Sequence, residues 1–314
     1  MESGKITLIT TGGTIASSRG GPMVSGTQLA AEVTRLLPQV QLETVELARV
    51  GSSQITFNLL HRLAGTCREA FQHRAQGVVV THGTDTLEET AYFLDLTVGH
   101  GPGPVVVTGA MRDRESASPE GLANLAASCR VALTSHARNY GVLVVMNDRI
   151  HTARDVAKAH SWLLDAFVSP VLGPVGLVSG DDVRFHHGPW PREPQPFTSP
   201  VQPVELIKLA LDCGDRLITE AVTAGVKGLV VEGMGLGHMP EGASVACLRA
   251  VEAGIPVVVT SRCLAGGAGS AGCVTSEGFI ASDLPGPKAR IKLMLALSIT
   301  SEPHAIARLF ASNP

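Results

Sequence analysis

Two hydroxyls and a carboxylate occupy turns that directly follow apolar runs of the sequence. Thr84 and Asp85 follow Val78–Thr81, and Thr14 follows Lys5–Thr10 after two glycines. A threonine hydroxyl is a weak nucleophile at its ordinary pKa, but a neighbouring base can activate it. The same residue types also cap helices by accepting backbone N–H bonds, with no chemistry at all. Taken singly, each turn leaves both interpretations open.

The apolar runs predict the strands that position these turns. Val78–Thr81, Pro104–Thr108 and Val142–Met146 are continuous rather than alternating, which indicates parallel strands that are covered on both faces. Loops at the carboxyl ends of parallel strands converge on one edge of an open α/β sheet, where ligands bind. We therefore expect Thr14 and Thr84 to meet at that edge.

The order of predicted strands and helices indicates an α/β protein with two domains, for which 314 residues are sufficient. Residues 1–184 predict a larger N-terminal domain with a mainly parallel sheet flanked by helices. Residues 185–203 contain six of the chain's 19 prolines and predict a linker of limited flexibility. Residues 204–314 predict a smaller C-terminal parallel α/β domain.

Composition excludes several classes of function. With 17% charged residues and a net charge of −3, the chain has no basic field for nucleic acid or anionic lipid. No apolar run reaches the length of a membrane span, and no secretory signal precedes the first strand, so we expect a cytoplasmic protein. The six cysteines form no C-x-x-C pair, and the eleven histidines form no H-E-x-x-H motif. We expect neither a metal nor a cofactor.

Six motifs then give a resemblance that covers nearly the whole chain and is densest before residue 180. The chain resembles the bacterial L-asparaginase/glutaminase family. The motifs are T-G-G-T-I-A at 11–16, G-S-S-Q at 51–54, V-V-T-H-G-T-D-T-L-E-E-T-A-Y-F-L at 79–94, T-G-A-M-R at 108–112, V-L-V-V-M-N-D at 142–148 and R-D-V-A-K at 154–158.

The resemblance implies an L-asparaginase-type amidohydrolase that converts L-asparagine to L-aspartate and ammonia. In such an enzyme Thr14 attacks the side-chain amide to form an acyl-enzyme, while Thr84 and Lys158 assist proton transfer. A lysine made more acidic by burial can accept a proton, and the Asp85 carboxylate can position it. Only the R-D-V-A-K motif distinguishes Lys158 from the other lysines of the chain. The spacing of the motifs does not show which of the two threonines attacks first.

The resemblance also implies how the substrate is held. Asp85 is expected to bind the α-ammonium group, and Ser53 with Gln54 the α-carboxylate, although helix capping explains these two residues equally well. The backbone near Ala110 is the expected neighbour of the bound amide. The active unit implied by the family is a homodimer, commonly paired into a homotetramer.

The sequence departs from the family pattern in three places. No tyrosine lies between Thr14 and Thr27, where the family's lid usually carries one. Leu236 stands where an asparagine is common, and the loop 268–275 has no acidic residue. Because the last two groups normally reach the substrate ammonium across a dimer interface, we expect weaker affinity or altered substrate preference, or recruitment of a group such as Glu277.

Three alternatives remain at this level. One methylene changes binding by only about 1–3 kcal/mol, so the sequence does not rank asparagine against glutamine. The missing tyrosine motivates a second hypothesis, a non-catalytic amino-acid-binding or regulatory protein on the same fold. A transamidation subunit is a third, for which an additional N-terminal domain would be expected.

Overall fold

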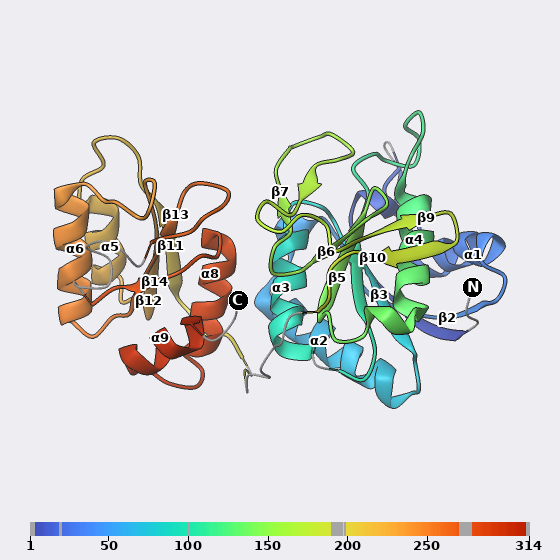
Figure 1. The fold of residues 1–314 in the computed structure, drawn as a ribbon, viewed down its shortest axis with the longest axis horizontal. Helices are drawn as coiled ribbons and strands as arrows, with labels where there is room; N and C mark the ends of the chain where they lie inside the picture. Colours follow the sequence, from blue (N-terminus) through green and yellow to red (C-terminus); the bar gives the residue numbers. More distant parts are fainter. Residues whose placement is uncertain are drawn as a thin grey trace. The chain divides into compact units, whose positions relative to one another are not determined.

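The computed structural model describes residues 4–18, 21–99, 101–189, 197, 199–269 and 278–311. It consists of two compact units, Met1–Trp190 and Pro191–Pro314 (Figure 1). The fold is mixed α/β, with a large N-terminal sheet and a smaller C-terminal one, which confirms the predicted fold class. The linker at 185–203 stays a prediction, and residues 190–196 and 198 of it lie outside the described residues.

An eight-stranded sheet forms the centre of the N-terminal unit, in the order β10-β9-β6-β5-β4-β3-β1-β2. Its strands are β1 Gly4–Gly12, β2 Val40–Val50, β3 Gly77–Thr81, β4 Val105–Thr108, β5 Val142–Met146, β6 Arg149–Thr152, β9 Gly176–Ser179 and β10 Asp182–Phe185. Strands β2, β1, β3, β4 and β5 pair in parallel, as their continuous apolar runs predict. The other three strands pair antiparallel at one edge.

The antiparallel edge was not foreseen from the sequence. Only Asn147 and Asp148 separate β5 from β6, and both have positive φ, 50° and 60°. Two consecutive residues of this kind form the tight hairpin turn that reverses a strand, and Asn and Asp tolerate the conformation. The chain therefore returns beside β5 instead of crossing over to a further parallel strand.

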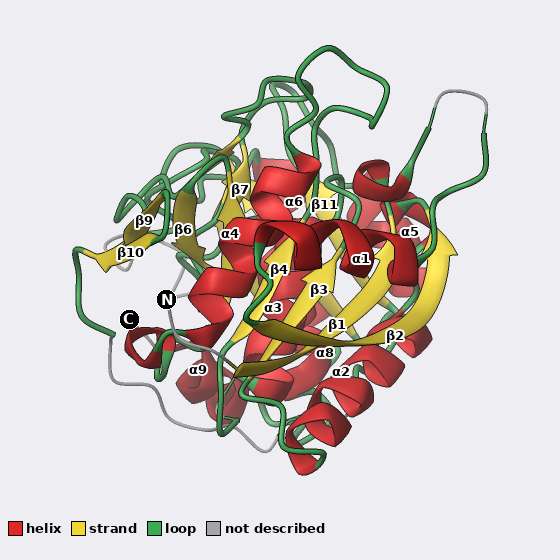
Figure 2. Cartoon of the chain, turned by 90° about the vertical axis from the view of Figure 1, so that its right-hand side faces the viewer, coloured by secondary structure: helices red, strands yellow, loops and turns green. Residues whose placement is uncertain are grey.

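Four helices cover the two faces of this sheet (Figure 2). They are α1 Gly26–Leu36, α2 Phe57–Gln72, α3 Leu87–Val98 and α4 Gly121–Leu133. Helices α1 and α4 pack on one face, where Leu29 and Leu125 join Leu8 and Val79 in one apolar cluster. Helices α2 and α3 pack against each other and cover β3 and β5. Because α3 follows β3 directly, its first turn lies at the carboxyl edge of the sheet.

The C-terminal unit has a four-stranded parallel sheet, in the order β11-β12-β13-β14 (Figure 1). The strands are β11 Val204–Lys208, β12 Gly228–Gly233, β13 Val257–Ser261 and β14 Ile280–Ala281, and the helices are α5 Arg216–Thr223, α6 Glu241–Glu252, α8 Gly286–Ala296 and α9 Pro303–Ala311. This arrangement confirms the smaller parallel α/β domain predicted from the sequence.

Cysteines in both units are free thiols in the part of the chain that the structure describes. Cys67 on α2, Cys129 on α4 and Cys247 on α6 are buried in the apolar layers. In the described ranges, none of the helices is both long enough and apolar enough to cross a membrane.

Candidate active site

The turns that follow β1 and β3 meet at the carboxyl edge of the N-terminal sheet. The two strands are parallel neighbours, so both chains leave the sheet on the same side. Gly13 has a φ of +85°, and a Cβ there would lie 2.4 Å from the Gly83 backbone nitrogen. Only glycine permits this approach. The structure therefore brings together the turns that carry Thr14, which is partly exposed, and Thr84, which is buried.

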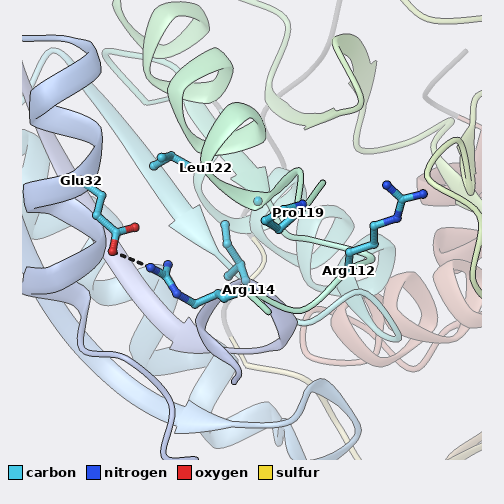
Figure 3. A pocket seen from close by; sticks show the side chains of 7 residues that line it. Glu32, Arg112, Arg114, Pro119 and Leu122 are labelled. Atoms are coloured by element: carbon cyan, nitrogen blue, oxygen red, sulfur yellow. Dashed lines mark hydrogen bonds and ion pairs between the residues drawn. The ribbon is translucent and has the colours of Figure 1, made fainter. Parts of the chain in front are cut away.

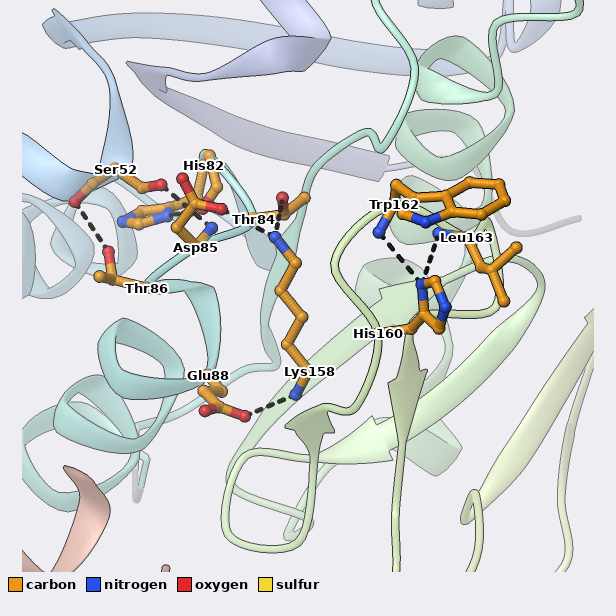
Figure 4. Close-up of polar contacts among 11 residues, drawn as sticks. Ser52, His82, Thr84, Asp85, Thr86, Glu88, Lys158, His160, Trp162 and Leu163 are labelled. Carbon is orange, nitrogen blue, oxygen red and sulfur yellow. Dashed lines mark hydrogen bonds and ion pairs between the residues drawn. The ribbon is translucent and has the colours of Figure 1, made fainter. Parts of the chain in front are cut away.

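Lys158 reaches the second of these turns from a separate short hairpin (Figure 4). It ends strand β7, Ala157–Lys158, which pairs with β8, Phe167–Val168. Its Nζ donates a hydrogen bond of 2.9 Å to Thr84 Oγ1 and one of 2.8 Å to Asp85 Oδ1. The lysine side chain is 13% exposed, whereas that of Asp85 is 68% exposed. The amine thus joins a buried hydroxyl to a carboxylate that faces solvent.

Glu88 fastens the backbone of this lysine. The Lys158 backbone N–H donates to Glu88 Oε2 at 2.7 Å, and Glu88 lies in the first turn of α3 (Figure 4). Helix α3 begins directly after the turn that carries Thr84. One element therefore fixes both partners of the contact between the Lys158 amine and the Thr84 hydroxyl.

Ser52 holds the same turn from the opposite side, and the sequence analysis did not identify it. It is buried at the start of a 3-10 turn, Ser52–Gln54, that follows β2. The Asp85 backbone N–H donates to Ser52 Oγ at 3.1 Å, and Thr86 Oγ1 donates to the Ser52 carbonyl at 2.9 Å. The predicted substrate-binding residues Ser53 and Gln54 complete the 3-10 turn and are exposed.

His82 is a second residue that the sequence analysis did not identify as part of the site. It is fully buried between the turn and helix α3. Its Nδ1 lies 2.7 Å from the Gly83 carbonyl oxygen, and its Nε2 lies 2.9 Å from Thr90 Oγ1. Burial lowers the pKa of His82 to about 4 because the charged imidazolium loses its hydration. The ring is therefore neutral at neutral pH.

The loop after β4 borders both turns. A Cβ on Gly109 would lie 3.3 Å from Thr84 Cγ2, so this backbone packs against the threonine side chain. The Asn124 side-chain amide on α4 donates to the Gly109 carbonyl at 3.0 Å and fixes the loop. Ala110, the predicted neighbour of the bound amide, is buried next to Gly109.

A cavity of about 170 Å³ lies next to the turn that carries Thr14 (Figure 3). Its lining consists of Ile15, Glu32, Arg112, Arg114, Pro119, Gly121 and Leu122. Arg114 pairs with Glu32 across it at 2.5 Å, and the Arg114 backbone N–H donates to the Ser17 carbonyl at 3.2 Å. Neither Thr84 nor Lys158 lines this cavity. Its residue Arg114 instead holds the segment that follows Thr14.

Among the described residues, no three His, Cys, Asp or Glu side chains lie close enough together to bind a metal ion. The groups assembled at the sheet edge are instead hydroxyls, an amine, a carboxylate and backbone N–H groups. These groups suit acyl transfer, in which a hydroxyl attacks and backbone donors stabilise the oxyanion.

Two family models together match almost the full length of the chain. The model described as Asparaginase, N-terminal matches residues 5–191, and the Glutaminase/Asparaginase C-terminal domain matches residues 203–310. The chain belongs to the asparaginase family. Members of this family are amidohydrolases, so this asparaginase-family protein is an enzyme of that class.

Individual relatives of this family agree in length and fold. An L-asparaginase of Bacillus licheniformis is 36% identical over 313 residues, which span 95% of this chain and 97% of that protein. A glutaminase-asparaginase of Pseudomonas aeruginosa is 32% identical over 97% of this chain and 89% of its own length. The crystal structure of a probable cytoplasmic L-asparaginase from Campylobacter jejuni superimposes with a TM-score of 0.92 at 34% identity, covering 99% of this chain and all of that one.

Proposed function

We propose that this asparaginase-family protein hydrolyses L-asparagine to L-aspartate and ammonia through a threonine nucleophile, with minor glutaminase activity. The observation that carries the proposal is the Lys158 amine bonded to both Thr84 Oγ1 and Asp85 Oδ1, at a turn whose backbone touches the turn of Thr14. The names of the relatives, L-asparaginase and glutaminase-asparaginase, support both activities. They give no support to the alternative, a non-catalytic amino-acid-binding protein.

The proposed reaction uses the two threonines in succession. Thr14 Oγ attacks the side-chain carbonyl carbon, and the resulting oxyanion is stabilised by backbone N–H groups of the two turns. Thr84 accepts a hydrogen bond from Lys158, so its own hydroxyl hydrogen can be donated on the substrate side. Proton transfer through Thr84 and Lys158 releases ammonia and leaves an acyl ester on Thr14. Water then hydrolyses the ester, giving aspartate and restoring the hydroxyl.

Substrate binding in this proposal follows from exposure and charge. Asp85 Oδ1 bonds the lysine, and the exposed carboxylate is available to the substrate α-ammonium group. Ser53 and Gln54 are exposed beside it and bind the α-carboxylate. Ser52 Oγ accepts a hydrogen bond from the Asp85 backbone N–H, so the Ser52 hydroxyl hydrogen can be donated to the substrate α-carboxylate. Ala110 borders the bound amide.

Ammonia release from a panel of amides tests the proposal. Wild-type protein should release ammonia from L-asparagine and more slowly from L-glutamine, and Thr14→Ala and Thr84→Val should each abolish the activity. Binding of L-asparagine without turnover by the wild type would favour the amino-acid-binding alternative instead. A fully active Thr14→Ala variant would remove Thr14 as the nucleophile.

Assembly belongs to the same proposal. We propose a homodimer or homotetramer in which a partner's C-terminal domain completes each site. Leu236, where the family commonly has asparagine, is 54% exposed, and the loop at 270–277, with Glu277, lies outside the described residues. Because these groups are missing, we expect weaker affinity, and a Michaelis constant for L-asparagine as low as that of an asparaginase with the full family set would contradict this. A chain that stays monomeric and is fully active would contradict the shared site.

A cytoplasmic location completes the proposal. The free thiols of the described residues suit a reducing compartment, and the Campylobacter relative is named as probably cytoplasmic. Fractionation of the producing cells, with activity recovered in the cytosolic fraction, tests the location. Recovery in a periplasmic extract would contradict it.

A further inference from the structure

We propose that His82 is a positioning residue that sets the orientation of Thr84 for catalysis. The inference rests on the proposed function, because it gives Thr84 a part in proton transfer. It goes beyond that function by adding His82, whose ring contacts neither Thr14 nor Lys158 in the hydrogen bonds described here. The imidazole contacts the Gly83 carbonyl and the Thr90 hydroxyl, at 2.7 Å and 2.9 Å.

The partners of the ring determine its tautomer. A carbonyl oxygen accepts and never donates, so the hydrogen bond to Gly83 requires a proton on Nδ1. The neutral ring then has an unprotonated Nε2, and the Thr90 hydroxyl must be the donor to it. Both ring nitrogens thus have a hydrogen-bond partner, one in the turn and one on helix α3, and these two bonds fix the orientation of the ring.

This lock acts on Thr84 through one peptide plane. The Gly83–Thr84 bond is trans, so the Gly83 carbonyl and the Thr84 N–H lie in one rigid plane and point in opposite directions. Holding the carbonyl against His82 therefore directs the Thr84 N–H away from the histidine. It also fixes the Thr84 Cα from which the hydroxyl reaches the Lys158 amine. Loss of the lock would let the plane rotate.

Asp85 has an anchor of its own. Its backbone N–H donates to Ser52 Oγ, whereas the His82 ring contacts the Gly83 carbonyl and Thr90. Loosening His82 should therefore disturb Thr84 while Asp85 and its substrate contacts stay in place. Such a change would lower kcat and leave KM nearly unchanged, since misplacement of a reacting group by about 1 Å costs up to about 100-fold in rate.

Two substitutions of His82 separate the two ring contacts. The amide nitrogen of His82→Asn occupies the place of Nδ1 and can still donate to the Gly83 carbonyl. The longer His82→Gln places its amide near Nε2, which keeps the Thr90 contact and loses the one to Gly83. We expect kcat for L-asparagine to fall about tenfold or more in His82→Gln, with KM within about twofold. We expect His82→Asn to recover most of the rate.

A second pair of variants tests the lock from the side of the helix, and it serves if the His82 variants fail to fold. Thr90→Val removes the hydroxyl that Nε2 accepts from, and Thr90→Ser keeps it. Thr97→Val on the same helix is the matched control, because the Thr97 hydroxyl donates to the Phe93 carbonyl of its own helix, at 2.8 Å, and not to the turn. We expect kcat to fall in Thr90→Val and to be restored in Thr90→Ser, with Thr97→Val equal to wild type.

The results separate this inference from the function on which it rests. Folded His82→Gln or Thr90→Val protein with wild-type kcat overturns the inference, as does a loss that appears in KM alone. Recovery of kcat in His82→Asn and Thr90→Ser supports it. A wild-type protein that releases no ammonia from any amide removes the proposed function itself, whatever the His82 variants do.

Discussion

At the scale of the residue, buried His82 gives the protein a defined response to acid. An unfolded histidine has a pKa near 6.5, and burial holds the pKa of His82 at about 4 in the folded state. The unfolded state therefore binds a proton between these two pH values while the folded state does not. Stability from this group is complete above pH 6.5 and is lost as the pH falls toward 4, because protonation then favours the unfolded chain.

The expected loss is about 3 kcal/mol of the unfolding free energy of the N-terminal unit between pH 7 and pH 4. Urea titrations at several pH values would measure it. His82→Gln should show a flatter dependence over this interval, because glutamine does not titrate. An unchanged slope in that variant would assign the acid sensitivity to other groups.

At the scale of the element, the N-terminus of α3 determines where the lysine hairpin sits. Glu88 on α3 bonds the Lys158 backbone, while the preceding turn carries Thr84. Glu88→Ala removes the hydrogen bond that this carboxylate accepts from the Lys158 backbone, and we expect kcat to fall about tenfold through displacement of the Lys158 amine. Glu88→Gln should retain most of the rate, since its amide oxygen still accepts the N–H. Equal rates for Glu88→Ala and wild type would show that β7 is held by other contacts.

The close approach of two turns gives a second prediction for elements. Gly13 has φ +85° and ψ 179°, a conformation nearly confined to glycine, and an added Cβ would overlap the Gly83 backbone. We expect Gly13→Ala to separate the turns, reduce kcat by at least 100-fold and lower the melting temperature.

Gly173→Ala is the control for Gly13→Ala, because Gly173 also has a positive φ, +73°, with no atom within 4 Å of the added Cβ. It should cost about 1–2 kcal/mol of stability and leave kcat unchanged. Equal effects of the two substitutions would mean that the approach of the turns is not required.

The elements also show how far sequence reasoning reaches. Continuous apolar runs identified β3, β4 and β5, because burial on both faces leaves a simple pattern. The antiparallel edge was missed, since the reversal depends on the positive φ of Asn147 and Asp148. Ser52 and His82 were missed for a related reason, because their roles depend on contacts that only the fold creates. Ser52 Oγ accepts a hydrogen bond from the Asp85 backbone 33 residues away, and His82 contacts the Gly83 carbonyl inside the buried turn. The duplicated serine in G-S-S-Q gave no signal to prefer Ser52.

At the scale of the whole molecule, the proposed shared site makes a surface residue of the C-terminal unit affect substrate affinity. Leu236→Asn would replace an exposed leucine by an amide that can bond the substrate ammonium of a partner subunit. One hydrogen bond to a charged group contributes about 1.5 kcal/mol, so KM for L-asparagine should fall about tenfold. Leu36→Asn on α1 is the control, because that leucine is similarly exposed, 52% against 54%. An unchanged KM in Leu236→Asn would exclude this loop from the site.

The buried cysteines of the two units have a practical consequence for following each unit separately. Burial raises the pKa of Cys67, Cys129 and Cys247 to about 12, and the thiolate is the form that alkylating reagents attack. These thiols are therefore inert while their unit stays folded and react once it opens. A pulse of iodoacetamide, read by peptide mass, would record opening of the N-terminal unit at Cys67 and Cys129 and opening of the C-terminal unit at Cys247.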